Sequence, residues 1–277
     1  MYAMVETVST VAHKRAPRVV LFDFDGTLSL VRSGWIGIMT DLFLRHLLEL
    51  QTGETEQSLR AVIGEFIWRL TGKETIYQME ALVEEIRKRG GTPKDAVFYK
   101  EEYLDRLNSV VRGRIAELKQ DEAAAEKYLV PGARVLLESL RARGMRLYLA
   151  SGTDDEDVKN ELSLLRAADY FEGRVWGAVE GPGRFAKQRV VRAIIEEEGY
   201  RGDEILAFGD GSVEIELTRQ VGGIAVGLAT DEPDCEIVDP WKRERLIGAG
   251  ADYIIPNYKE SAVLLPLLFP EPVPAAV

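Results

Sequence analysis

The chain has 277 residues, 46% of them hydrophobic, which is enough to bury the core of one or two domains. Lys and Arg number 35 against 46 Asp and Glu, and the resulting net charge of −11 disfavours nucleic acid and anionic membranes, because both bind basic faces. Cys235 is the only cysteine, which excludes an intrachain disulfide and a thiolate zinc cluster.

The amino-terminal region lacks the pattern of a targeting segment. Within residues 1–17, Glu6, His13 and Lys14 interrupt the apolar residues, so the continuous core of a signal peptide is missing. Elsewhere no apolar run approaches the roughly 18 residues of a membrane span. We therefore expect a cytoplasmic protein.

The first predicted strand is the apolar run Val-Val-Leu-Phe at residues 19–22. A short run without polar residues is typical of a strand that is buried on both faces, as in a parallel sheet. The sequence Asp-Phe-Asp-Gly-Thr follows directly at residues 23–27.

Residues 35–119 have helical patterns and no convincing strand. Apolar residues recur at three- and four-residue steps in 59–70 and again in 76–86, as in amphipathic helices. Glycines end both stripes, and Pro93 suits the first turn of a further helix. The sequence predicts a helical bundle that is inserted into another domain.

From residue 130 onward, predicted strands alternate with predicted helices. Strands are expected at 145–150, 175–179, 205–208, 224–226 and 253–255, and helices at 131–143, 187–198 and 214–220. Residues 153–156, Thr-Asp-Asp-Glu, match a capping box that would open another helix, and the acidic residues 154–157 would then only supply charge at its amino terminus.

This alternation predicts an α/β fold. The expected core is a doubly wound, Rossmann-like, mostly parallel sheet with an inserted all-helical cap domain. The first part of the core would span residues 1–31, the cap 32–128, and the second part of the core 129–277.

Polar side chains follow three of the predicted strands. Asp23 and Asp25 follow the first, Ser151 a second and Asp210 a third. Ligands bind beyond the carboxyl ends of strands in open parallel sheets, so these residues share one crevice if their strands are neighbours. With Glu214 as a fourth carboxylate, the oxygen-only set suits Mg²⁺. Taken alone, the Asp-Gly pair would indicate an ordinary turn.

The motifs resemble those of the haloacid dehalogenase superfamily of hydrolases, in its phosphatase branch (phosphoglycolate phosphatase-like). Residues 23–27 are similar to the first motif, 147–152 to the second, Lys187 to the third and 205–214 to the fourth. The resemblance covers about residues 17–256 by analogy of pattern. It implies that the helical cap closes over the site and selects the substrate.

The resemblance also implies catalytic roles. Asp23 would be the nucleophile that forms an aspartyl-phosphate, and Asp25 the general acid and then the general base. Mg²⁺ would be bound by Asp23, the backbone carbonyl of Asp25 and Asp210, and Glu214 would hold a metal-bound water.

Further residues would bind the phosphate and the rest of the substrate. The Ser151 hydroxyl would bind a phosphoryl oxygen, and Lys187 would pair with the phosphate and with Asp23. Arg184 and Arg189 compete with Lys187 for this role. The loop that carries Lys73 is either a substrate reader or an ordinary surface turn. The expected substrate-binding residues are Thr27, Gly152, Arg32, Trp35 and Lys73.

The resulting prediction is a Mg²⁺-dependent phosphohydrolase that acts on a small phosphorylated metabolite. A sugar phosphomutase would keep both aspartates and stays an alternative. A phosphonatase would need a lysine in the cap, for which Lys73 is the candidate. A non-catalytic binding relative would have lost a motif residue, whereas every motif position is filled here. A dehalogenase is disfavoured because that branch generally lacks the acid at Asp25.

Overall fold

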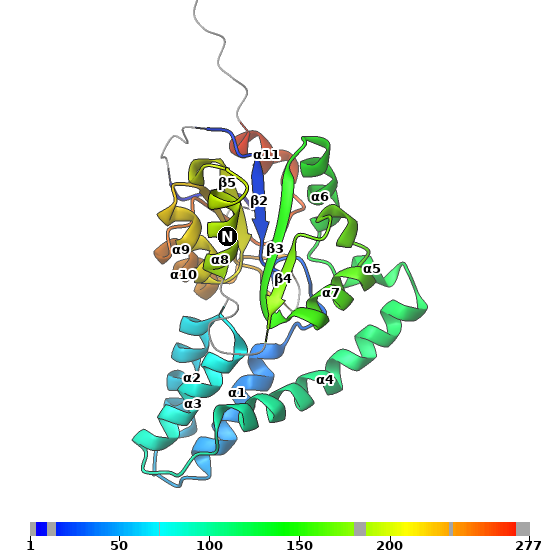
Figure 1. Ribbon diagram of the computed structural model, residues 1–277. Helices are drawn as coiled ribbons and strands as arrows, with labels where there is room; N and C mark the ends of the chain where they lie inside the picture. Colours follow the sequence, from blue (N-terminus) through cyan, green and yellow to red (C-terminus); the bar gives the residue numbers. More distant parts are fainter. Residues whose placement is uncertain (1–3, 10–14, 72, 180–186, 233–234, 270–277) are drawn as a thin grey trace, which may run out of the picture.

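The computed structural model describes residues 4–9, 15–71, 73–179, 187–232 and 235–269. Its centre is a seven-stranded sheet with the strand order β1-β7-β6-β5-β2-β3-β4 (Figure 1). The strands are β1 (Glu6–Thr7), β2 (Val19–Phe22), β3 (Arg146–Asp154), β4 (Val175–Ala178), β5 (Ile205–Gly209), β6 (Ile224–Leu228) and β7 (Tyr253–Ile255). Every pair is parallel except β1 with β7. The predicted mostly parallel sheet is confirmed.

Helices cover both faces of the sheet, as the short apolar strands predicted. On one face Val19 and Leu21 pack in a cluster with α8 (Lys187–Glu196). On the other face Val20 and Phe22 pack with α6 (Ala133–Ala142) and α11 (Ser261–Leu268). Alternate residues of β2 point to opposite faces, and all four are buried. The doubly wound α/β fold is therefore confirmed.

Three more helices border the sheet: α7 (Asp155–Leu164), α9 (Ser212–Gln220) and α10 (Pro240–Gly248). The expected capping box at residues 153–156 is wrong. Thr153 lies within β3, and Asp154, the residue before α7, makes no side-chain cap. Neither α10 nor α11 was predicted, although Asp239 followed by Pro240 is a recognisable helix start: the Asp239 carboxylate accepts from two backbone amides of α10.

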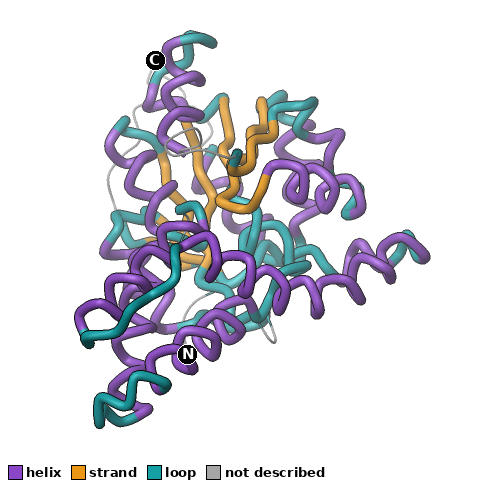
Figure 2. Tube along the Cα trace, turned by 60° about the horizontal axis from the view of Figure 1, so that its bottom comes forward, coloured by secondary structure: helices purple, strands orange, loops and turns teal. Residues whose placement is uncertain are grey.

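The segment between β2 and β3 forms α1 (Trp35–Leu48), α2 (Glu56–Leu70), α3 (Thr75–Lys88), α4 (Ala96–Gln120) and α5 (Ala124–Lys127). We call residues 35–127 the helical segment; apart from position 72 the structure describes all of it, and this described part contains no strand. The arrowheads of β2 and β4 point toward it (Figure 1), and the second view shows it in front of the strands (Figure 2). Over the described ranges, no helix is both long enough and apolar enough to traverse a membrane.

Candidate active site

The three polar strand ends meet at one edge of the sheet. β2 lies between β3 and β5, and Phe22 is in register with Leu149 and with Phe208. The next two strands along the chain, β3 and β4, lie on one side of β2, and the following strand, β5, lies on its other side. Ligands bind at such a topological switch point in α/β sheets. The structure therefore brings Asp23, Ser151 and Asp210 together.

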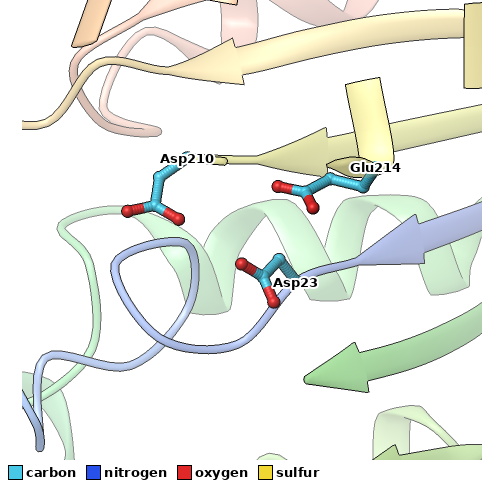
Figure 3. Close-up of side chains that lie close together, drawn as sticks. All are labelled: Asp23, Asp210 and Glu214. Carbon is cyan, nitrogen blue, oxygen red and sulfur yellow. The ribbon is translucent and has the colours of Figure 1, made fainter. Parts of the chain in front are cut away.

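Three carboxylates gather at this edge: Asp23 after β2, Asp210 after β5 and Glu214 on α9 (Figure 3). One oxygen from each lies within 4.8 Å of the others, and all three side chains are buried. Carboxylates this close repel unless a proton or a cation lies among them. Because every donor is a hard oxygen, the set fits Mg²⁺, which is bound by few carboxylates together with waters and phosphate oxygens.

Lys187 is buried behind this acidic trio. Its side chain is 1% exposed, and its Nζ lies 2.8 Å from Asp23 Oδ1 and 2.8 Å from Glu214 Oε2. Glu214 also accepts a hydrogen bond from the backbone N–H of Gly211 at 3.0 Å. Burial raises the pKa of the Glu214 carboxyl, while Lys187 acts in the opposite direction. Glu214 thus fixes Lys187 beside Asp23.

Asp25 faces the site from the loop after β2. Its Oδ2 accepts hydrogen bonds from Thr153 Oγ1 at 2.7 Å and from Ser151 Oγ at 3.3 Å. Its Oδ1 is buried and has no hydrogen-bond partner within the described residues. Burial raises the pKa of the Asp25 carboxyl, against the effect of Arg32. A carboxyl in this setting can carry a proton and still present a free oxygen to a ligand.

Arg32 is held by α7 and is not a free cation. Its Nε and Nη2 donate to Glu161 Oε1 at 2.9 and 2.6 Å, and Nη2 also donates to Asp157 Oδ2 at 2.8 Å. Asp154, the residue before α7, accepts a hydrogen bond from Lys100 Nζ of α4 at 2.9 Å. The expectation that residues 154–157 only supply helix-end charge is therefore wrong for Asp154 and Asp157, which pair with basic side chains from distant parts of the chain.

Thr27 lies behind the site and does not line the pocket, contrary to the expected substrate contact. Its side chain is fully buried, and its Oγ1 accepts a hydrogen bond from the backbone N–H of Asp210 at 3.1 Å. The preceding Gly26 has a φ of +73°, and a Cβ there would lie 2.4 Å from Asp210 Oδ2. The Gly26-Thr27 turn therefore positions the loop that carries Asp210.

A cavity of about 70 Å³ lies between the strand ends and the helical segment. Gly152 forms part of the contact between the two, because a Cβ at this residue would lie 2.5 Å from the carbonyl oxygen of Lys73. The cavity is lined by Asp23, Asp25, Arg32, Trp35, Thr71, Lys73, Thr75, Gln78, Lys100, Tyr103, Leu104, Leu107, Ser151, Gly152, Thr153, Asp154, Asp157 and Asp210. Four of the five expected substrate-binding residues are in this set.

Several lining or adjacent residues were not predicted from the sequence. Tyr103 and Gln78 lie on helical stripes, where buried side chains are usually core. Thr153 belonged to the expected capping box. Lys242 on α10 is buried beside Asp210 and donates to Glu232 at 2.9 Å. It stands in the charged sequence Trp-Lys-Arg-Glu-Arg, which is typical of a solvated helix, so no local signal separated it from its neighbours.

The fold and the site agree with a family comparison. The family model described as "Hydrolase: haloacid dehalogenase-like hydrolase" matches residues 17–222. The chain belongs to this family. The predicted recognition is thus confirmed, and the haloacid dehalogenase-like match includes all four motifs.

Individual relatives of this haloacid dehalogenase-like chain include phosphatases. A phosphoserine phosphatase from Archaeoglobus fulgidus is 24% identical over 254 residues, 87% of this chain and 61% of that protein. A phosphoglycolate phosphatase from Synechococcus elongatus is 25% identical over 127 residues, 46% of this chain and 54% of that protein. The aligned part is thus under two thirds of the length of either relative.

Solved structures support the same fold. A predicted phosphoglycolate phosphatase from Haemophilus somnus superposes with a TM-score of 0.57 at 16% identity, covering 91% of this chain and 99% of that one. At this identity the likeness concerns the fold alone.

Proposed function

We propose that the protein is a Mg²⁺-dependent phosphohydrolase that removes phosphate from a small phosphorylated metabolite through an aspartyl-phosphate. The observation that carries this proposal is the arrangement of two aspartates on one pocket. Asp23 pairs with a buried lysine and belongs to the acidic trio, while Asp25 has a carboxyl oxygen without a partner among the described residues. The phosphatase relatives support the same reaction class.

In the first step, a carboxylate oxygen of Asp23 attacks phosphorus and the bond from phosphorus to the ester oxygen breaks. Lys187 lies 2.8 Å from Asp23 Oδ1 and fixes the orientation of the carboxylate for this attack. Protonated Asp25 donates its proton to the leaving oxygen, and the raised pKa of its carboxyl makes that form available. Thr153 orients Asp25 through its hydroxyl, and the Ser151 hydroxyl, 3.3 Å from Asp25 Oδ2, would bind a phosphoryl oxygen.

In the second step, Asp25 is a carboxylate and accepts a proton from water. The water oxygen attacks phosphorus, the bond to Asp23 breaks, and inorganic phosphate leaves with Asp23 restored. Asp25 thereby regains the proton that it gave in the first step, so one residue serves both half-reactions.

The metal would be held by Asp23, the backbone carbonyl of Asp25 and Asp210, with Glu214 as a more distant carboxylate behind Lys187. When bound, Mg²⁺ supplies positive charge that screens the attacking carboxylate from the phosphate and offsets charge in the transition state.

We further propose that residues 32–128 act as a cap and that residues 1–31 and 129–277 form the core. The cavity of about 70 Å³ lies between these two parts and would hold the substrate beyond its phosphate. Trp35, Lys73 and Gly152 would contact that part of the substrate. Arg32, already neutralised by two carboxylates, would bind a neutral or polar group more readily than a second anion.

The phosphohydrolase has three alternatives: a phosphonatase, a sugar phosphomutase and a non-catalytic binding relative. A phosphonatase is disfavoured because Lys73 is exposed, whereas an amine that forms a Schiff base is activated by desolvation or a neighbouring cation. A mutase would return the phosphoryl group to a sugar hydroxyl without using water. We expect phosphate release from p-nitrophenyl phosphate and from small phosphate esters only with Mg²⁺, and one ¹⁸O atom per phosphate from labelled water. Phosphate transfer without label would indicate the mutase, and no turnover the binding relative.

Asp210→Asn should weaken metal binding while leaving the fold intact. The amide keeps an oxygen but loses the negative charge. Because loss of an outer partner of a metal ligand typically costs about 10–100-fold in affinity, a direct ligand should cost at least as much. Titrating activity with Mg²⁺ should show half-saturation at roughly 10-fold higher concentration or more. Asp105→Asn, an exposed residue of α4, is the control. An unchanged Mg²⁺ curve would exclude Asp210 as a ligand.

Gly152→Ala should push the helical segment away from the core. The new Cβ would lie 2.5 Å from the carbonyl oxygen of Lys73, which is backbone and cannot swing aside like a side chain. Because misplacement by about 1 Å can cost about 10²-fold, kcat/KM on the best metabolite should fall by up to that factor. Gly64→Ala on α2, where a Cβ meets nothing within 4 Å, is the control. Equal kcat/KM in both variants would contradict the cap's closure at this contact.

A further inference from the structure

Lys242 is a buried lysine that the reaction described above does not use. It lies in the first turn of α10, where its backbone N–H donates to Asp239 Oδ1 at 2.8 Å. Its side chain is 3% exposed, and its Nζ donates to Asp210 Oδ2 at 3.3 Å and to Glu232 Oε1 at 2.9 Å. A buried ammonium needs such carboxylates to offset its lost hydration. Lys242 is therefore fixed against one particular oxygen of the acidic trio.

Asp210 Oδ2 is confined on a second side by the backbone at Gly26. Gly26 approaches Asp210 Oδ2 so closely that a Cβ on Gly26 would lie 2.4 Å from it. The backbone of Asp210 is tied to Thr27 Oγ1 as well, so the whole residue is held from the β2 loop. One oxygen of Asp210 points toward Asp23 and the other points away (Figure 3). With Oδ2 bound by Lys242, Oδ1 is the oxygen that Asp210 can offer to a cation.

The number of oxygens that a carboxylate offers matters differently to Mg²⁺ and to Ca²⁺. Mg²⁺ is small and demands near-octahedral coordination by single oxygens and waters. Ca²⁺ is larger, takes six to eight oxygens and readily uses both oxygens of one carboxylate. A carboxylate whose second oxygen is bound by a lysine satisfies Mg²⁺ and removes a ligand that Ca²⁺ would take.

We propose that Lys242 is a positioning residue that restricts Asp210 to one metal-binding oxygen and so makes this site prefer Mg²⁺ to Ca²⁺. The inference rests on the proposed metal site. It concerns the choice of cation, which lies beyond the assignment of the ligands themselves.

The charge of Lys242 has a separate effect that the test must exclude. Removing one positive charge beside the site strengthens the binding of any divalent cation by Coulombic attraction. This effect acts on Mg²⁺ and Ca²⁺ alike, because both carry the same charge. Freeing Asp210 Oδ2 benefits Ca²⁺ more, because only Ca²⁺ readily uses the second oxygen. The ratio of the two affinities therefore separates geometry from charge.

The experiment is isothermal titration of the full chain with Mg²⁺ and with Ca²⁺, without substrate. Lys242→Met should tighten Ca²⁺ binding relative to Mg²⁺ by roughly 10-fold, the scale of gaining one oxygen ligand. Lys242→Arg can still donate to both carboxylates and should restore the wild-type ratio. Lys259→Met, which removes a surface lysine paired with Glu236, is the matched control and should leave the ratio unchanged.

A second variant covers the case in which Lys242→Met does not fold. Glu232 would then lack its partner, so Glu232→Gln combined with Lys242→Met removes both charges and still frees Asp210 Oδ2. In folded Lys242→Met, or in the folded double variant, an unchanged affinity ratio overturns the proposal, as does a wild type that binds neither cation.

The outcome is separable from the proposed reaction. A shifted ratio in a protein that releases no phosphate would leave this inference standing and overturn the phosphohydrolase. Mg²⁺-dependent phosphate release with an unchanged ratio would overturn this inference and leave the phosphohydrolase standing.

Discussion

Asp23→Asn should abolish phosphate release while the protein stays folded. Asparagine has the shape of aspartate and can still accept the bond from Lys187, but it lacks the charge and nucleophilicity needed to attack phosphorus. Removing a covalent nucleophile costs up to about 10⁶-fold in other enzymes, so turnover should fall by roughly 10⁴-fold or more, to background. The measurement is initial phosphate release with saturating Mg²⁺.

The same variant tests the covalent intermediate directly. Acid-quenched wild-type enzyme should carry one phosphoryl group on the peptide that contains residue 23, and Asp23→Asn should carry none. Asp41→Asn, which alters a surface ion pair with Arg60, should behave as the wild type. Phosphoryl label on another residue of the wild type, or near-normal turnover by Asp23→Asn, would move the chemistry elsewhere.

Asp25→Asn should slow both half-reactions. The amide can keep its hydrogen bond with Thr153, but it can neither donate a proton to the leaving group nor take one from water. Loss of a general acid or base typically costs about 10²–10⁴-fold, so kcat on alkyl phosphates should fall within that range.

The leaving group separates the two roles of Asp25. p-Nitrophenolate leaves without protonation, so its transfer to Asp23 should be affected far less than transfer from an alkyl ester. Hydrolysis of the aspartyl-phosphate should still be slow, and a burst of p-nitrophenol should precede the steady state. Thr153→Val, which only removes a hydrogen bond to Asp25, should show a smaller loss and no burst. An unchanged ratio of alkyl to aryl activity in Asp25→Asn would exclude proton donation by this residue.

Much of the fold could be predicted from local patterns. The apolar runs at β2 and β5 have no polar residue, and burial on both faces is the environment that such runs require. Because β2 pairs in parallel with β3 and β5, their carboxyl ends had to meet at one edge. The gathering of Asp23, Ser151 and Asp210 was therefore predictable once the strands were taken as neighbours. The motif order alone sufficed for the family.

The partners of individual side chains were decided by the tertiary structure. Thr153 had the local pattern of a helix cap, but its hydroxyl binds Asp25 more than a hundred positions earlier. Arg32 was expected to be available to substrate, and two carboxylates of α7 neutralise it. Lys242 stands among charged residues, as in a solvated helix, but its side chain is buried against Asp210.

The sequence and the tertiary structure decide different features because the underlying interactions act over different ranges along the chain. Hydrophobic periodicity and caps act within a few residues along the chain, so the sequence by itself determined every described strand except the two-residue β1, most of the helices, and the motifs at the strand ends. Ion pairs and hydrogen bonds at the site join residues from different elements, and any nearby carboxylate can serve a buried cation. Which carboxylate it is depends on the packing of α7 and α10 against the sheet, and only the folded structure decides that.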